Sequence, residues 1–217
     1  MSDLVKKIKT KIDDKKLEKE TKLLDSAYKL YVNKGINNTS IQDIVNDAGV
    51  AKGTFYLYFK DKYDLEEVLI IKKSYELFHR ALEKLNINVI KDFSDQLIFV
   101  IDSVIDELKS NPDLIKIIYK DLSFGFYNKG INTIFDNEQI GIYETFMKGI
   151  KDNNVKLENP DVTLYMIIEL VGSTIFNSIV KNIPLSIDEY KPYLYNTIRV
   201  MLKEKNWWFS FFIGHKM

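Results

Sequence analysis

The chain has 217 residues, with 46% hydrophobic and 29% charged side chains, as in an ordinary globular protein. It contains no cysteine, which excludes disulfide frameworks and thiolate metal sites. The lysine-rich start lacks the apolar centre of a secretory signal, and no apolar run approaches the roughly 20 residues that span a bilayer. We therefore expect a cytoplasmic protein with no membrane span.

The charge is unevenly distributed along the chain. Formal net charge is zero, because 31 basic residues balance 31 acidic ones. Residues 1–62 nevertheless hold about 13 lysines and about 9 acidic residues, a surplus of roughly +4. A basic front part can attract the phosphates of a nucleic acid. A chance fluctuation in a lysine-rich protein gives the same tally, so charge alone does not decide.

Apolar residues recur at helical spacing almost throughout, and no strict alternation bounded by turns indicates a sheet. The pattern predicts an all-α protein. In chain order, the predicted helices cover residues 16–34, 40–48, 51–59, 62–85, 93–110, 112–124, 137–151, 160–181 and 187–205. Residues 124–133, with two glycines, are predicted to form a loop.

Several short signals set the expected helix ends. Gly35 and Gly49 are placed to end the first two helices in the left-handed conformation. Asp61 is placed to cap the fourth helix. Capping boxes are predicted before the second and last helices, formed by Thr39 with Gln42 and by Ser186 with Glu189.

The stretch 39–65, TSIQDIVNDAGVAKGTFYLYFKDKYDL, predicts a helix-turn-helix unit. Ala48 allows two short helices to approach each other, and Gly49 supplies the turn. Val50, Phe55 and Phe59 are expected to face inward. The outward residues at the start of the third helix are then Lys52, Gly53, Thr54, Tyr56 and Leu57. Because the first residues of a recognition helix meet base edges in the major groove, the unit is predicted to bind DNA.

Lys62 gives a second indication of DNA binding. A lysine in the first turn of a helix opposes the helix dipole, at a cost of about 0.3–1 kcal/mol. The same helix end attracts phosphate, which a lysine would help to hold. The alternative is a solvated lysine that folding tolerates.

Residues 48–65, AGVAKGTFYLYFKDKYDL, preceded by LLDSAYKLYVNKG at 23–35, closely resemble the DNA-binding signature of the TetR family of transcriptional regulators. The resemblance covers roughly the first quarter of the chain. It implies a homodimer with an all-helical effector-binding body, most often a repressor that a small ligand releases from DNA. Many members carry arginine near the first helix, whereas the arginines of this chain are Arg80 and Arg199.

Carried over by position, the resemblance implies a set of DNA contacts. Thr39 and Ser40 would touch the DNA backbone, and Lys52, Gly53 and Thr54 would meet bases and adjacent phosphates. Tyr56 and Tyr58 would contact phosphate or base edges, although Tyr58 has an inward packing alternative, and Lys62 would hold a phosphate. The lysine-rich arm, residues 6–16, either follows the DNA backbone or minor groove or is a solvated tail.

We expect a DNA-binding domain at 1–62 and an effector-binding and dimerisation domain at 63–217. The expected dimer interface comprises Tyr165, Ile168, Gly172, Ile175, Phe176, Tyr193, Leu194, Ile198 and Met201. The expected pocket for a small apolar or aromatic ligand comprises Tyr119, Phe124, Tyr127, Tyr143, Phe146, Met147, Met166 and Glu169. A plain hydrophobic core is the alternative for each of these aromatic residues.

The functional hypothesis is a homodimeric repressor released from a near-palindromic operator by a ligand. One alternative is a DNA-binding regulator controlled by a protein partner, and a more distant one is an adaptor that keeps the fold without DNA binding. No metal site, cofactor or catalytic role is predicted, because only two histidines occur and no HExxH, GxGxxG, P-loop or GxSxG pattern is present. The aromatic stretch 207–213 is expected to pack on the body or a partner subunit, with interfacial membrane contact as the alternative.

Overall fold

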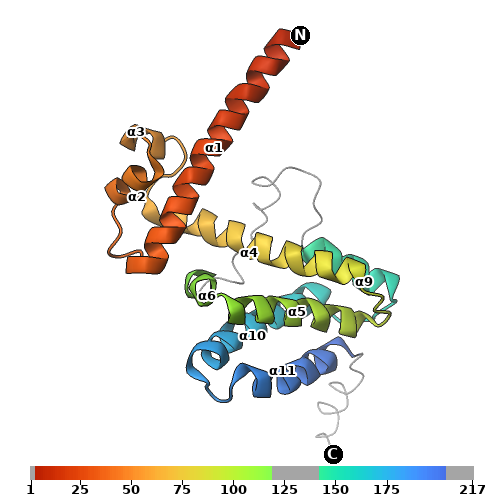
Figure 1. Ribbon diagram of the computed structural model, residues 1–217. Coiled ribbons are helices and arrows are strands. Elements are labelled where there is room, and N and C mark those ends of the chain that lie inside the picture. The colour runs from red at the N-terminus through yellow and green to blue at the C-terminus, as the bar shows by residue number, and fades with distance from the viewer. Residues whose placement is uncertain (1–2, 119–141, 204–217) are drawn as a thin grey trace, which may run out of the picture. The chain divides into compact units, whose positions relative to one another are not determined.

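Helices make up the regular structure of the part of the chain that the computed structural model describes, residues 3–118 and 142–203, with side chains from residue 15 onward (Figure 1). The elements are α1 (Asp3–Lys34), α2 (Ile41–Ala48), α3 (Lys52–Phe55), α4 (Lys62–Ile87), α5 (Phe93–Ser110), α6 (Pro112–Ile118), α9 (Ile142–Asp152), α10 (Pro160–Lys181) and α11 (Ile187–Leu202). No strand occurs in these ranges, so the all-α prediction is confirmed.

The chain divides into two compact units, Met1–Lys72 and Lys73–Met217. The division falls within α4, which begins in the first unit and ends in the second. Each unit has buried apolar residues of its own.

In the first unit, α1 packs on α2, and α2 packs on α3. Phe55 and Phe59 are buried as predicted, together with Ile44 and Val45 of α2, whereas Val50 is half-buried. Gly35 and Gly49 have φ angles of 78° and 66°, which confirms the left-handed ends expected there. Asp61 caps α4, since its carboxylate accepts from the amides of Tyr63 and Asp64.

Two helix predictions in this unit are corrected. The first helix begins at Asp3 instead of residue 16, because no glycine or proline interrupts the helical backbone before Gly35. The third helix ends at Phe55 instead of residue 59. The backbone then tightens, since the amides of Leu57 and Tyr58 bond three residues back to Thr54 and Phe55.

In the second unit, α5 packs against α10 and α11, and α10 also packs against α9 and α11. The α5–α11 contact carries polar pairs at its edge: Arg199 binds Asp95, Lys191 binds Asp102 and Asp106, and Lys109 binds Asp188. The Ser186–Glu189 capping box is present as predicted at the start of α11. These contacts hold α11 along α5.

The helix α10 is long and apolar enough to cross a membrane by length and composition. This finding corrects the expectation that no apolar run approaches that length. In the structure α10 buries Leu164, Ile167, Ile168, Val171 and Ile175 among helices α5, α9 and α11. A helix in the core of a protein has the same length, composition and packing.

Some sequence predictions lie outside the described residues. They are the loop 124–133, the ends of the helices predicted at 112–124, 137–151 and 187–205, the aromatic stretch 207–213, and the candidate ligand residues Tyr119, Phe124 and Tyr127.

Candidate nucleic-acid interface

The second helix is held at both ends by features of its own sequence. Ser40 is the N-cap, and its hydroxyl and amide form a capping box with Asp43. Gly49 ends the helix in the left-handed conformation, which leads directly into α3. The capping pair predicted from sequence, Thr39 with Gln42, is therefore displaced by one residue.

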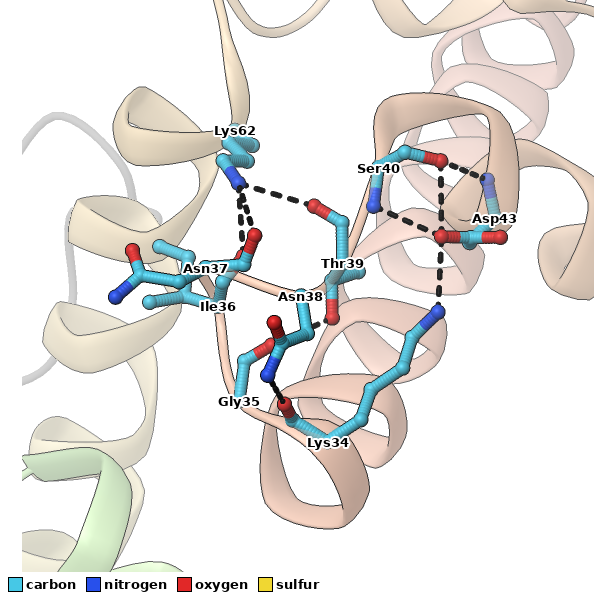
Figure 2. Close-up of polar contacts among 9 residues, drawn as sticks. All are labelled: Lys34, Gly35, Ile36, Asn37, Asn38, Thr39, Ser40, Asp43 and Lys62. Atoms are coloured by element: carbon cyan, nitrogen blue, oxygen red, sulfur yellow. Dashed lines mark hydrogen bonds and ion pairs between the residues drawn. The ribbon is translucent and has the colours of Figure 1, made fainter.

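Thr39 is buried beneath this cap because its hydroxyl donates to the carbonyl of Gly35 at 2.8 Å (Figure 2). Its side chain is only 1% exposed, so it lies in the core of the first unit. The side chain of Ser40 is exposed. Of the two residues expected to touch the DNA backbone, Ser40 is the one whose side chain reaches the surface.

Ion pairs tie α2 to α1. Lys34 lies 2.9 Å from the carboxylate of Asp43, and Lys29 lies 2.6 Å from that of Asp47. The hydrogen bond from Lys34 and those from Ser40 hold the pKa of Asp43 well below its usual range. The pKa of Asp47 is lowered too, mainly by Lys29. Both acidic residues of α2 are therefore paired with lysines of α1.

The third helix carries the residues that the sequence predicts to enter the DNA groove. Lys52 and Gly53 are exposed at its start, and Thr54 is half-buried. Tyr56 and Leu57 follow with 54% and 76% of their surface exposed. Beneath them Phe55 is fully buried and stacks edge-on with Tyr56, at 5.4 Å between ring centroids. The exposed ring of Tyr56 thus packs on a buried aromatic side chain.

Tyr58 takes an intermediate position. It is half-buried, and its ring lies 6.2 Å from that of Phe59. Burial raises the pKa of its hydroxyl, with a smaller contribution from the charge of Glu20. Its position therefore combines a packing role with access to the surface.

Lys62 does not project freely from the start of α4. Its ammonium donates to the backbone carbonyls of Ile36, Asn37 and Thr39 (Figure 2). The sequence carries no sign of this arrangement, since the acceptors are main-chain atoms more than 20 residues away.

The candidate ligand residues that fall in the described ranges are spread over several surroundings. Phe146 is buried against Phe93, Met147 and Glu169 are half-buried, and Tyr143 and Met166 are 41% and 47% exposed. None of these five lines the small apolar pocket of the second unit.

That pocket has a volume of about 50 Å³ and lies among α4, α5, α9 and α10. It is lined by apolar side chains, among them Phe78, Leu97, Val100, Ile101 and Val104. The sequence signal was present, because residues 97, 100, 101 and 104 form a helical stripe. A stripe of this kind does not reveal whether it lines a core or a pocket.

The candidate interface residues of α10 and α11 separate into two groups. Ile168, Gly172, Ile175, Leu194 and Ile198 are buried within the chain. Their side chains contribute to the core of the second unit, since α10 and α11 pack on α5 and on each other. Phe176 and Met201 are half-buried, while Tyr165 and Tyr193 are 46% and 67% exposed.

No group of three or more histidine, aspartate or glutamate residues that could hold a metal ion occurs in the described ranges.

A capped helix, a left-handed glycine turn and a second short helix with an exposed lysine at its start define a helix-turn-helix DNA-binding protein.

Comparison with known proteins identifies the family. Residues 23–68 match the model of the bacterial regulatory proteins of the tetR family. The HTH-type transcriptional regulator YvdT of Bacillus subtilis is 30% identical over 159 residues, which cover 72% of this chain and 80% of that protein. The chain therefore belongs to the TetR family of DNA-binding transcriptional regulators, whose members are not enzymes.

Solved structures share the fold. A TetR-family regulator from Syntrophomonas wolfei has a TM-score of 0.60 at 20% identity, covering 85% of this chain and 95% of that one. The regulator FadR from Bacillus subtilis, solved in complex with stearoyl-CoA, has a TM-score of 0.56 at 18% identity, covering 82% of this chain and 96% of that one.

Proposed function

We propose that this protein is a homodimeric repressor that a small apolar ligand releases from a near-palindromic operator. The observation that carries the proposal is the pairing of two features in separate units. The first unit exposes Lys52 and Gly53 at the start of α3, and the second unit contains a pocket with an apolar lining.

On the DNA side, we propose that Lys52, Gly53 and Thr54 meet base edges and adjacent phosphates. Tyr56 and Ser40 are also exposed and would contact the DNA backbone. Tyr58 would contribute its hydroxyl from a half-buried position. For Thr39, whose side chain is buried and bonded to the carbonyl of Gly35, we propose a supporting role for the cap at Ser40.

For the dimer, we propose a face made by the outer sides of α10 and α11. Its exposed apolar side chains are Val162, Tyr165, Met166, Tyr193 and Val200. Two copies that pair these helices would form a four-helix interface. Twofold symmetry would then place two recognition helices about one turn of DNA, or a small multiple, apart.

For the ligand, we propose an apolar chain such as a fatty acyl group. The lining residues of the pocket are all apolar, and the FadR protein of similar fold is known in complex with stearoyl-CoA. Ligand pockets usually measure about 300–1,000 Å³. The pocket of about 50 Å³ must therefore widen to hold such a chain.

In this mechanism the ligand favours a body arrangement in which the two DNA-binding units are wrongly spaced for the operator. We propose α4 as the link, because it is continuous from Lys62 to Ile87 and belongs to both units. The protein would act in the cytoplasm, with α10 as a core helix and without a cofactor.

A titration tests the ligand-released repressor. The probe is a labelled duplex selected from a random DNA pool by the protein itself, and stearoyl-CoA is added at increasing concentration. We expect the DNA affinity to fall, with coenzyme A alone as the matched control. If stearoyl-CoA binds the protein, as measured by calorimetry, and DNA affinity stays constant, the release mechanism is contradicted.

The small size of the pocket favours one other candidate, a regulator that responds to a protein partner instead of a ligand. The variant Val104→Trp separates the two, because the larger side chain would fill the pocket. A ligand-released repressor should lose its response to stearoyl-CoA while it keeps its DNA affinity. A regulator without a ligand should show no response to stearoyl-CoA in either form.

A further inference from the structure

The ammonium group of Lys62 is fully engaged by the main chain (Figure 2). From the first turn of α4, its Nζ donates to the carbonyl oxygens of Ile36 at 2.8 Å, Thr39 at 3.1 Å and Asn37 at 3.4 Å. A lysine ammonium has three protons. These three acceptors equal its number of protons, so the main chain competes with a phosphate for each of them.

The acceptors belong to the loop that follows the C-terminus of α1. The last carbonyls of a helix lack partners within the helix and carry the negative end of its dipole. In this loop the side-chain amide of Asn38 donates to the carbonyl of Lys34, and the hydroxyl of Thr39 donates to that of Gly35. Lys62 supplies donors for carbonyls further along the loop. A lysine that is unfavourable for its own helix is thus favourable for the end of α1.

A second hydrogen bond holds Lys62 by its backbone. The hydroxyl of Tyr31, on α1, donates to the carbonyl oxygen of Lys62 at 2.8 Å. Tyr31 is 4% exposed, and burial raises the pKa of its hydroxyl, so it remains a donor at any ordinary pH. Lys62 is therefore bound to α1 and to the loop through both its main chain and its side chain.

We propose that Lys62 is a positioning residue for DNA binding, which fixes residues 35–39 against the start of α4 and so sets where Ser40 begins α2. It acts through the helix-turn-helix unit and holds no phosphate itself. The loop ends at the cap of α2, and α2 leads through Gly49 into the exposed start of α3. Release of the loop would leave the first residue of α2 free to move, and DNA would have to order it on binding.

Salt dependence separates this role from a phosphate contact. The logarithm of DNA affinity falls linearly with the logarithm of salt concentration, and each phosphate contact adds about 0.9 to the slope. Affinity is measured by fluorescence anisotropy from about 50 to about 200 mM salt on the selected duplex. The variants are Lys62→Met, Lys52→Met and Lys60→Met, which each remove one positive charge. Lys60 is exposed two residues before Lys62 and serves as the charge-matched control.

We expect Lys62→Met to weaken DNA binding by about tenfold, since a loosened residue must be ordered on binding, and to leave the salt slope unchanged. Lys52→Met should lower the slope by about 0.9 for each phosphate that the lysine neutralises. Lys60→Met should change the affinity much less than Lys62→Met. A slope for Lys62→Met that falls as far as that of Lys52→Met would overturn the proposal.

The charge-conserving variant Lys62→Arg is the second test. A planar guanidinium suits a phosphate at least as well as an ammonium does, but its fork does not match three converging carbonyls. We expect Lys62→Arg to weaken DNA binding about as much as Lys62→Met. Binding equal to that of the wild type would show that the charge, and with it a phosphate contact, is what matters.

A variant without a charge change, together with hydrogen exchange, separates loss of loop positioning from loss of charge or global unfolding. Tyr31→Phe removes the bond to the Lys62 carbonyl and no charge, and we expect it to weaken DNA binding about threefold. Hydrogen exchange should be faster at residues 35–40 in Tyr31→Phe and Lys62→Met, and unchanged in α11. Unaltered exchange at residues 35–40 in both folded variants would refute the positioning role.

Discussion

At the scale of single residues, Gly49 and Gly53 of the helix-turn-helix unit have different structural roles. Gly49 has a φ of 66°, a conformation that side-chain-bearing residues rarely adopt, whereas Gly53 lies in the first turn of α3. A Cβ added at either position would meet no atom within 4 Å. Space is therefore not the reason for either glycine.

The variant Gly49→Ala should lower the free energy of unfolding by about 1 kcal/mol, because alanine is strained in the left-handed region. The matched variant Gly53→Ala should leave stability the same or slightly higher, since alanine favours a helix. Gly53→Ala should still weaken DNA binding, because the methyl group stands where the backbone approaches the groove. Urea unfolding and anisotropy on the selected duplex measure the two effects; equal stability of the two variants would contradict the first.

Two adjacent capping patterns explain why the sequence alone did not identify the N-cap of α2. Thr39 and Ser40 are adjacent hydroxyls, and Gln42 and Asp43 each lie three residues further on. Either pair satisfies the capping pattern. The choice depends on the bond of Thr39 to Gly35 and on the pairing of Asp43 with Lys34, which are contacts that the pattern does not contain.

At the scale of elements, α9 approaches α5 closely because Gly149 has no side chain. A Cβ on Gly149 would overlap the ring of Phe93, which is itself 7% exposed and packed on Phe146. The small residue therefore allows an aromatic ring to fill the contact between two helices.

The variant Gly149→Ala should destabilise the second unit by about 1–3 kcal/mol, because the added methyl group overlaps a buried ring that has little room to move. The double variant Gly149→Ala with Phe93→Leu should recover part of this loss, since the smaller side chain removes the overlap. Urea unfolding measures both. Additive losses in the double variant would show that the ring is not the obstacle.

The contact of α11 with α5 depends on pH through Asp102. Burial opposes the charge on Asp102, but hydrogen bonds from Lys191 and Tyr195 and the charge of Lys191 outweigh it and lower the pKa. Stability from a carboxyl with a lowered pKa is present above its unfolded value, about 4, and is lost as the pH falls through the folded value.

The variant Asp102→Asn should therefore lower the free energy of unfolding at neutral pH by up to about 1 kcal/mol, because the carboxylate is partly exposed and water screens it. The difference from the wild type should shrink as the pH falls below about 4. Urea unfolding at neutral and acidic pH checks this. A difference that stays constant with pH would assign the effect to poorer packing.

At the scale of the whole molecule, function depends on which apolar surfaces stay outside the core. The faces of α10 and α11 that the periodicity marks as most apolar are occupied within the subunit, around Ile175 and Ile198. The surface available to a second copy consists of neighbouring exposed side chains such as Tyr193.

The variant Tyr193→Glu should convert the proposed homodimer into a monomer, because each copy would bury a carboxylate in the proposed interface. Light scattering after size-exclusion chromatography measures the mass. Val89→Glu is the control, since it places the same charge on a residue that is 92% exposed just after the end of α4. A monomer should also bind the selected duplex more weakly. A dimer that survives Tyr193→Glu would move the interface elsewhere.

The sequence by itself determined the all-α class, the glycine turn and the exposed start of α3, because left-handed glycines and apolar periodicity act over a few residues. It did not determine where the first helix begins, where the third ends or which residues cap the second. The tertiary structure decided the partner of Lys62, which residues surround the pocket and which face of α10 is buried. These depend on groups brought together from distant parts of the chain, such as Lys62 and the loop carbonyls of Ile36 and Thr39. Local patterns carry no record of such encounters, since a lysine looks the same in sequence whether it meets a phosphate or a carbonyl.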